Sequence, residues 1–299
     1  MHRSNPEEPN RPTGSSSYII VYQSLAHGHK VQNCVASTMI AAAQKIQNLK
    51  TLFKNDCCNN SLEKTKRCIE EFCTTRAYMT EVFCDRDPLS PKIQNAFANT
   101  CVTTYIAGAD EILIHKLTST ENFEFYDLIK SFMLQADQWI RLERDTLPEN
   151  HIIVLDIKEY TLAIISKSNI FYFQKFLIFL LQGMPVRLKQ VHVVNCPSYI
   201  DYLYGLVKGA LPQDIRDLIK FHTDHNGLHQ HIDKKYLPSE YGGDAEEMVK
   251  QSLKWIEDIK DLRKTYLDDS IWKADLSKKP KNGTVDTAMS GSFRALAID

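Results

Sequence analysis

The fold is decided by the stretch Pro185-Val-Arg-Leu-Lys-Gln-Val-His-Val-Val-Asn-Cys-Pro197, in which two basic residues precede a β-branched run. A β-branched run bounded by prolines is typical of a buried strand. The residues that follow, from Tyr199, repeat apolar side chains at helical spacing up to Lys208-Gly209, which predicts an amphipathic helix. We therefore expect a strand and a helix of one βα unit that hide an apolar ligand and open near a charged surface.

Length and composition indicate a globular chain of one large domain or two modest ones. The chain has 299 residues, of which 43% are hydrophobic, and this suffices for a buried core. Because the net charge is −1, no overall field attracts nucleic acid, and an electrostatic partner must meet a local patch. No apolar run reaches about 18 residues, and the polar segment 1–17 lacks the apolar stretch of a signal peptide. We therefore expect a cytoplasmic protein without a membrane span.

Common catalytic signatures are missing from the sequence, which contains no GxSxG elbow, P-loop or GxGxxG. Its eight cysteines form no CxxC pair, which favours free thiols over a disulfide framework. One group has the chemistry of a metal site: His222, His225, His229 and His231 with Asp224. Their spacing matches no helical pair such as HExxH, so we favour satisfied or surface histidines and expect neither a metal nor another cofactor.

Hydrophobic periodicity predicts helices first, and then strands that alternate with helices. Apolar residues recur at spacings of three and four over 35–53 and 62–72. Strands are expected at 111–117, 151–157 and near 219–222, and helices at 123–144, 166–183 and 245–267. The helix at 166–183 is apolar nearly all round, which fits a thick core or the wall of an internal cavity. This alternation predicts a mixed α/β sheet.

Two motifs are specific when they occur together, namely Asn195-Cys-Pro197 and Leu237-Pro-Ser-Glu-Tyr-Gly-Gly243. Accompanying motifs are Asp156, Pro185-Val-Arg-Leu-Lys189, His192, Leu206-Val-Lys208, Arg76 with Phe83-Cys-Asp-Arg-Asp-Pro88, and Gly291-Ser-Phe-Arg294. In these residues the chain resembles the CRAL-TRIO lipid-binding family, and within it the arthropod-type alpha-tocopherol transfer protein-like branch. The resemblance runs from about residue 45 to the end of the sequence.

The resemblance implies an α/β fold in which a helical N-terminal part precedes a mixed sheet, flanked by helices that enclose an apolar cavity. Its divisions would be a disordered or irregular N-terminus at 1–34, helices at 35–105, a lipid-binding domain at 106–267 and a tail at 268–299. Residues at the family's pocket positions are expected to contact the ligand: Ile129, Phe132, Ala136, Leu155, Phe176, Phe179, Leu180, Met184, Leu188 and Val191.

By the same resemblance, residues 199–211 form a gate helix whose apolar and aromatic face suits a membrane interface. Its gate residues are Tyr199, Ile200, Leu203, Tyr204, Leu206 and Val207. Some relatives hold phosphoinositide phosphates at basic positions that match Arg187, Lys189 and Lys208. The chain departs from the family at Lys208-Gly-Ala210, where Lys-Pro-Phe is usual. It departs again at Asp214 and Leu218, which are basic in phosphoinositide-responsive relatives, so the basic patch is incomplete.

The expected function is to bind one hydrophobic small molecule inside the cell and to transfer it between membranes. The ligand would be tocopherol-, retinoid- or phospholipid-like, with phosphoinositide contact at the rim of the site. No catalysis is required, so we expect a monomeric carrier with transient membrane contact, and not an enzyme. Two alternatives stay open: a hydrolase that uses a metal at the 222–231 histidines, and a lipid sensor or scaffold that does not exchange its ligand.

Overall fold

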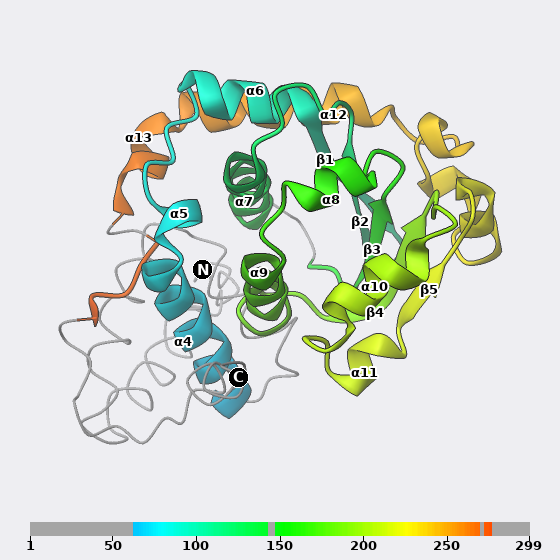
Figure 1. The fold of residues 1–299 in the computed structure, drawn as a ribbon, viewed down its shortest axis with the longest axis horizontal. Helices are drawn as coiled ribbons and strands as arrows, with labels where there is room; N and C mark the ends of the chain where they lie inside the picture. Colours follow the sequence, from blue (N-terminus) through cyan, green and yellow to red (C-terminus); the bar gives the residue numbers. More distant parts are fainter. Residues whose placement is uncertain (1–61, 143–146, 270–271, 277–299) are drawn as a thin grey trace, which may run out of the picture. The chain divides into compact units, whose positions relative to one another are not determined.

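The computed structural model describes residues 62–142, 147–269 and 272–276. The N-terminal segment 1–34, the helix predicted at 35–53 and the motif at 291–294 lie outside these residues. The chain divides into two units, of which the first comprises residues 38–274. All helices and strands described below belong to the first unit (Figure 1).

Among the described residues, five strands form one sheet in the order β1-β2-β3-β4-β5. They are β1 (Thr100–Ala107), β2 (Asp110–Leu117), β3 (Asn150–Asp156), β4 (Leu188–Val194) and β5 (Ile219–Phe221). β1 and β2 form an antiparallel hairpin, and each later pair of neighbours is parallel. The predicted mixed α/β sheet is therefore confirmed, with strands in all the predicted places.

β1 is absent from the predicted strands, although the sequence carries a signal for it. Thr, Val, Tyr and Ile are frequent in this segment, and these residues favour strands. Gly108 follows at φ 67°, a left-handed conformation that glycine adopts without steric cost, and it supplies the turn into β2.

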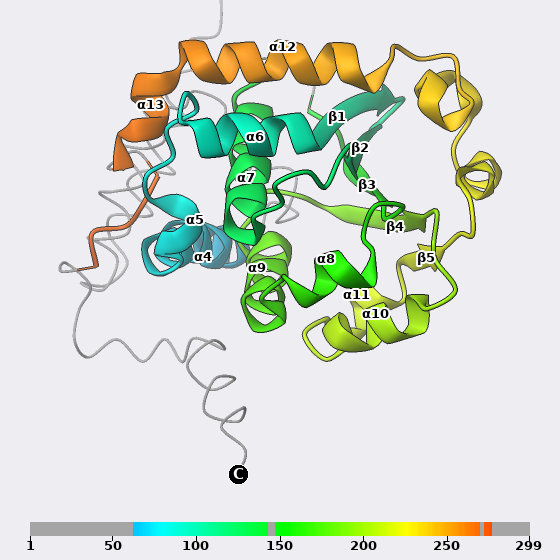
Figure 2. The ribbon, with the colours of Figure 1, turned by 45° about the horizontal axis from the view of Figure 1, so that its top comes forward.

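Helices flank the sheet on both sides. They are α4 (Leu62–Tyr78), α5 (Thr80–Phe83), α6 (Pro91–Asn99), α7 (Phe125–Arg141), α8 (Leu162–Ser166), α9 (Ile170–Gln182), α10 (Ile200–Lys208), α11 (Gln213–Arg216), α12 (Met248–Asp261) and α13 (Arg263–Leu267). Three short 3₁₀ turns, η1 (His225–Gln230), η2 (Lys234–Tyr236) and η3 (Ser239–Tyr241), lie between β5 and α12 in the described part of the chain. α12 packs beside β1 and α7 (Figure 2).

The prediction of one helix at 166–183 is wrong, because α8 ends at Ser166 and α9 begins at Ile170. Asn169 lies between them in extended conformation, and its side-chain oxygen accepts a hydrogen bond from the N–H of Tyr172 (3.0 Å). This N-cap satisfies one of the free donors at a helix start, so it begins a new helix.

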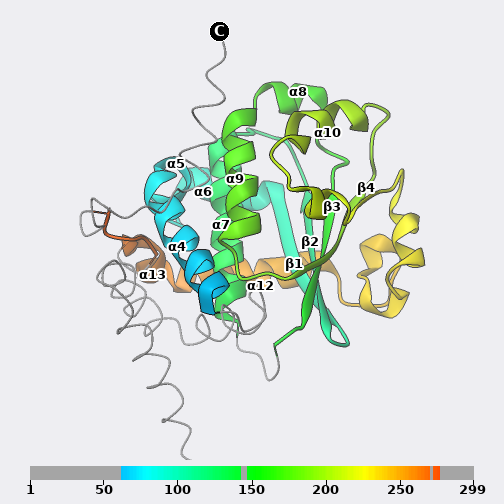
Figure 3. The same ribbon diagram turned by 90° about the horizontal axis from the view of Figure 1, so that it is seen from below.

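Strand register arranges the side chains of one sheet face in rows. One row contains His115, Leu155, Val193 and Phe221, and the next contains Leu113, Ile153, Val191 and Ile219. These rows face α7 and α9, because His115 contacts Phe132 of α7 and Ile153 packs with the core cluster that includes Phe176 of α9. We call this the α9 face of the sheet (Figure 3).

The opposite face of the sheet is covered by the chain that follows β5. Its residues Ile112, Ile114, Ile152, Val154 and Val194 form a second buried cluster with Leu228, Ile232, Leu237, Tyr241 and Met248. Figure 3 shows the 3₁₀ turns, in yellow, across the sheet from α7 and α9. The fold therefore has two cores, one on each face of the sheet.

A buried charge cluster joins the N-terminal helices to α7. Asp137 accepts two hydrogen bonds from Arg76, at 2.6 and 3.0 Å, and a further one from Arg86. All three side chains are excluded from solvent. The Arg76 guanidinium also lies 3.9 Å from the ring centre of Phe72, within the range of a cation–π contact. The Arg76 and Phe83–Pro88 motifs of the sequence therefore belong to one buried charge cluster, which links α4 and the segment after α5 to α7.

Candidate functional site

The α9 face is apolar but incompletely packed at its centre. Ile153 and Leu155 of β3 are only half-buried, although β3 is the middle strand of the sheet. α9 shows the same property, since it buries only Tyr172, Phe176 and Phe179. Phe171 is exposed, and its other apolar side chains are half-buried: Ile170, Phe173, Leu177, Ile178, Leu180 and Leu181. A helix this apolar would normally be buried on several sides, so these side chains lack part of the packing that their chemistry favours.

The ten predicted ligand-contact residues come from elements that border this face. Ile129, Phe132 and Ala136 belong to α7, Leu155 to β3, Phe176, Phe179 and Leu180 to α9, Met184 to the turn after it, and Leu188 and Val191 to β4. Leu188 and Val191 share a face because a bulge shifts the register between their partners, His151 and Ile153. Edge-to-face contacts link Phe132 to His115 (5.3 Å) and to Phe176 (6.0 Å).

Phe179 stands apart from the half-buried members of this set. It is fully excluded from solvent, and its ring lies 5.4 Å from that of Phe83 and 6.3 Å from that of Phe72. Gly183 leaves room for it, since a Cβ there would lie 3.0 Å from the Phe179 ring. These contacts with α4 and α5 give Phe179 a core role that needs no ligand. The half-buried residues are therefore the sharper probes of a binding site.

His115 is a polar residue on the α9 face that the sequence interpretation overlooked. Its Nε2 lies 3.2 Å from the hydroxyl oxygen of Thr100, and its ring packs against Phe132. Burial lowers the pKa of this imidazole from 6.5 to about 4, against a weaker opposing effect of Asp156. His115 is therefore neutral at pH 7, with one nitrogen that donates and one that accepts.

The low pKa of His115 predicts a loss of stability in mild acid. The unfolded imidazole takes up a proton as the pH falls through about 6.5, whereas the folded one does so only near 4, so acid favours unfolding between these values. We expect the wild type to lose about 2 kcal/mol more unfolding free energy between pH 7 and pH 5 than His115→Gln. Urea denaturation at the two pH values measures this difference. Equal losses in the two proteins would show that His115 is not buried in neutral form.

α10 is weakly attached to the rest of the fold. Not one of its nine residues is fully buried, and Leu203, Leu206 and Val207 are half-buried. One hydrogen bond joins it to α9, from Nε2 of Gln174 to the carbonyl oxygen of Leu206 (2.5 Å). A ring contact of 5.1 Å joins Tyr204 to Phe221 on the α9 face of β5. Elements with few buried apolar contacts open at low free-energy cost.

The three predicted phosphate-binding residues come from two parts of the unit. Arg187 and Lys189 lie at the amino end of β4, and Lys208 lies in the last turn of α10. Lys189 forms an ion pair with Asp110, with 2.6 Å between Nζ and Oδ2. Lys208 is exposed in the last turn of α10 and lies 5.9 Å from the ring centre of Tyr204.

Asp156, at the end of β3, joins the two most specific motifs of the sequence. Its Oδ1 accepts hydrogen bonds from Nδ2 of Asn195 (2.9 Å) and from the N–H of Lys158 (3.0 Å). Its Oδ2 accepts a hydrogen bond from the hydroxyl of Tyr241 (3.0 Å). Asn195 has φ 56°, a left-handed conformation that asparagine tolerates better than most residues. The motifs therefore shape the sheet end from which the chain enters α10.

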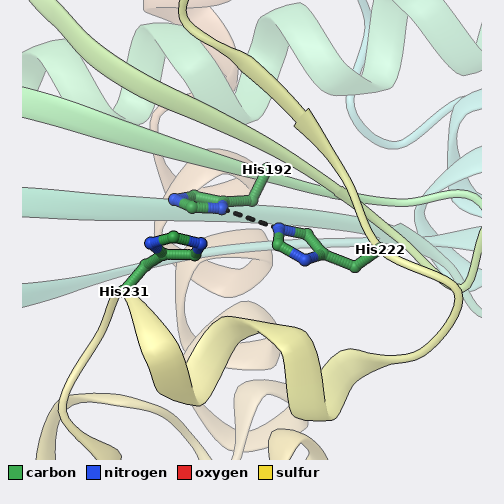
Figure 4. Close-up of side chains that lie close together, drawn as sticks. All are labelled: His192, His222 and His231. Carbon is green, nitrogen blue, oxygen red and sulfur yellow. Dashed lines mark hydrogen bonds between the residues drawn. The ribbon is translucent and has the colours of Figure 1, made fainter.

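Three histidines meet on the face opposite α9 (Figure 4). Nδ1 of His192 lies 3.0 Å from Nε2 of His222, and a ligand atom of His231 lies within 4.8 Å of both residues. Burial is the main cause that lowers the pKa of each imidazole, to about 4 for His192, so all three are neutral at pH 7.

The histidine group anticipated from the sequence is wrong in its membership. His225 packs its ring against Tyr241 (6.0 Å), and Nε2 of His229 lies 2.7 Å from the carbonyl oxygen of Tyr241. Neither belongs to the group formed by His222 and His231, which instead includes His192 of β4. Parallel pairing of β4 with β5 creates this proximity, and sequence spacing does not reveal it.

In the part of the chain that the structure describes, no helix has both the length and the apolar character needed to cross a membrane.

Comparison with known proteins finds a family model and relatives that match the region around the sheet. Residues 111–243 match the family model of the CRAL/TRIO domain. An alpha-tocopherol transfer protein-like protein of Homo sapiens is 31% identical over 128 residues, which cover 42% of this chain and 37% of that protein. Clavesin-1 of Rattus norvegicus is 32% identical over 121 residues, which cover 40% and 34% of the two chains. The crystal structure of Sfh5 superposes with a TM-score of 0.47 at 16% identity, over 73% of this chain and 77% of that one.

The similarity to the curated proteins spans little more than a third of their length. The matched family region, however, begins in β2 and ends at Gly243, so it contains β3, β4, α9, α10 and the motifs that meet at Asp156. The resemblance seen in those motifs is thereby confirmed for residues 111–243, which match the CRAL/TRIO domain.

Proposed function

We propose that this chain binds one hydrophobic small molecule between the α9 face of the sheet and helices α9 and α10, and transfers it between membranes. The observation that carries the proposal is the incomplete burial of Ile153 and Leu155 on the central strand. Helices that packed directly on a central strand would bury such side chains fully. The CRAL/TRIO family binds hydrophobic small molecules, which have the chemistry to complete this packing.

A ligand in this position gains free energy mainly by leaving water. Each Å² of apolar surface removed from water contributes about 25 cal/mol, before the costs of association are subtracted. His115 is the one polar side chain that β2, β3, β4 and β5 contribute to the two rows of the α9 face. As a neutral imidazole it can hydrogen-bond a hydroxyl or carbonyl group, and so fix the orientation of a tocopherol-, retinoid- or phospholipid-like ligand.

α10 is the gate of the proposed site. Its weak attachment to α9 and its half-buried apolar side chains support a helix that can leave the sheet and offer those side chains to a membrane. The aromatic rings of Tyr202 and Tyr204 suit the interface, because a tyrosine ring packs with hydrocarbon while its hydroxyl stays in water. The protein would act as a monomer in the cytoplasm and touch the membrane during exchange.

A phosphoinositide at the rim of the site would contact Arg187, Lys189 and Lys208. A phosphate at Lys189 must compete with Asp110, which already accepts from that ammonium group at 2.6 Å. Basic residues near an anionic surface contribute about 1 kcal/mol each, and Asp214 and Leu218 add none. These features support a modest dependence of transfer on anionic lipid.

Leu155→Trp tests the binding site directly. If a ligand fills space above Leu155, the larger side chain takes up that space, and we expect affinity for a fluorescent tocopherol or phospholipid probe to fall at least about tenfold, which is 1.4 kcal/mol. The unliganded variant should keep most of its stability. Leu253→Trp, at an exposed position of α12, is the matched control and should bind normally.

A loss of stability without a loss of affinity in Leu155→Trp would contradict the proposed site. Without space above Leu155, tryptophan would overpack the core and cost about 1–3 kcal/mol of unfolding free energy. A destabilised Leu155→Trp protein that binds the probe with wild-type affinity would place the ligand elsewhere.

A further inference from the structure

We propose that His192, His222 and His231 form a binding site for one divalent transition-metal ion, with Zn²⁺ as the best fit. The site lies on the face opposite α9, so it is separate from the proposed lipid site and does not depend on it. One ligand atom from each histidine lies within 4.8 Å of the others. Imidazole nitrogens are ordinary ligands of Zn²⁺, Cu²⁺ and Ni²⁺, and three of them leave a fourth position for water.

The spacing of the nitrogens suits a tetrahedral ion. With Zn–N bonds of about 2.0–2.1 Å, two ligands at the tetrahedral angle lie about 3.3 Å apart. Nδ1 of His192 and Nε2 of His222 are 3.0 Å apart, so the two rings need to move apart only slightly to admit the ion. His231 has more distance to close, and it can do so because it is exposed at the end of η1.

Neighbouring residues orient the rings of His192 and His222. Nε2 of His192 lies 3.1 Å from Oε1 of Gln190. If this nitrogen donates to the amide oxygen, Nδ1 of His192 keeps its lone pair for a metal. Gly227 provides the corresponding support for His222, since a Cβ there would lie 2.4 Å from Nδ1 of the His222 ring. Backbone thus occupies the Nδ1 side of His222, and its Nε2 is the nitrogen that faces His192.

One nearby cation opposes metal binding. Nζ of Lys220 lies 3.4 Å from Nδ1 of His231, and it also lowers the pKa of that imidazole. Since two positive charges repel each other, Lys220 should weaken the site, and its removal should strengthen it. This gives the proposal a test in which a variant binds metal better than the wild type.

A metal here would fasten the ends of the segment that carries α10. His192 is on β4, before α10, and His222 directly follows β5, after α10 and α11. His231 ties the same ion to the end of η1. The ion would therefore hold β5 and η1 against β4 as a structural clamp, in addition to the three-residue pairing of β4 with β5.

The test is titration of the full chain, without an added histidine tag, with Zn²⁺ against a chromogenic chelator. We expect one Zn²⁺ site that His231→Gln weakens at least about tenfold, the lower end of what even outer-shell changes cost. His225→Gln, whose ring lies outside the group, should bind as the wild type does, and Lys220→Gln should bind more tightly. At a concentration of about 100 times its dissociation constant, Zn²⁺ should raise the Tm of the wild type by about 5–10 °C. The same Zn²⁺ concentration should raise the Tm of His231→Gln much less.

Co²⁺ in place of Zn²⁺ provides an independent readout, because a four-coordinate complex has a characteristic visible absorption that His231→Gln should abolish. Equal Zn²⁺ affinities of the wild type and a folded His231→Gln variant would overturn the proposal, and the histidines would then form only a hydrogen-bonded group. If His231→Gln fails to fold, an unchanged or weaker affinity in Lys220→Gln would overturn it instead.

Discussion

Replacing Asp137 with asparagine is expected to lower the free energy of unfolding by about 3–5 kcal/mol. The substitution keeps the shape of the side chain and removes the charge that Arg76 and Arg86 share. Both guanidinium groups are fully buried, so each would be left as a charge without its carboxylate partner in a medium that solvates charge poorly. Burial already lowers the pKa of Arg76, against the opposing effect of Asp137.

Urea denaturation of the two proteins measures this loss. Asp87→Asn is the matched control, since Asp87 forms a two-point ion pair with Arg263 at the surface, at 2.6 and 2.7 Å. Solvent screens such surface pairs, so the control should lose far less stability. A loss for Asp137→Asn no greater than that of the control would contradict the role given to the buried cluster.

Leu203→Asp is expected to reduce the rate of lipid transfer between vesicles by about tenfold or more. Leu203 is half-buried on the apolar side of α10, where the proposed gate meets either the ligand or the membrane. An aspartate placed in an apolar membrane environment costs about 2.5–3.5 kcal/mol at full depth, and 1.4 kcal/mol already corresponds to a factor of ten. The measurement is transfer of a fluorescent lipid from donor to acceptor vesicles.

Leu253→Asp, the same change at an exposed position of α12, should leave the transfer rate nearly unchanged. Ligand affinity is measured separately, so that a binding defect is not mistaken for a transfer defect. A Leu203→Asp protein that folds, binds and transfers at the wild-type rate would place the gate elsewhere. Wild-type protein that binds lipid without exchanging it would instead favour a sensor or scaffold.

Much of the fold could be predicted from local sequence. The strands at β2, β3 and β4 are β-branched runs with clear boundaries, and period and turn residues suffice to find them. β1 and the break between α8 and α9 were missed for different reasons. β1 joins α6 directly, with Thr100 as both C-cap and first strand residue. The α8–α9 break depends on the cap formed by Asn169, inside a stretch that is apolar on both sides.

Pairings between distant residues could not be predicted in the same way. Asp137 lies 61 residues from Arg76 and 51 from Arg86, and no periodic pattern joins them. His192 is 30 residues from its partner His222, and the two meet only because β4 pairs with β5. The family motifs included Arg76 and His192, but their roles in the buried charge cluster and in the histidine group follow only from the packing.

For the predicted ligand contacts, too, the sequence supplied the positions, and the packing decides the role of each residue. Resemblance supplied a set of apolar positions, and the structure separates Phe179, whose ring packs against α4 and α5, from half-buried residues such as Leu155. His115 was passed over because a single histidine in an apolar strand has no local signature. Only the register, which aligns it with Leu155, places it on the α9 face.

The central claim is that the α9 face holds one hydrophobic molecule, and native mass spectrometry tests it most directly. The full chain is incubated with vesicles that contain tocopherol, retinoid and phospholipid, separated from them, and weighed before and after denaturation. We predict a folded species heavier than the bare chain by the mass of one lipid, with the addition lost on denaturation and reduced in Leu155→Trp but not in Leu253→Trp. A folded wild-type protein that acquires no lipid mass from these vesicles, or an equal lipid adduct in Leu155→Trp, would contradict this account.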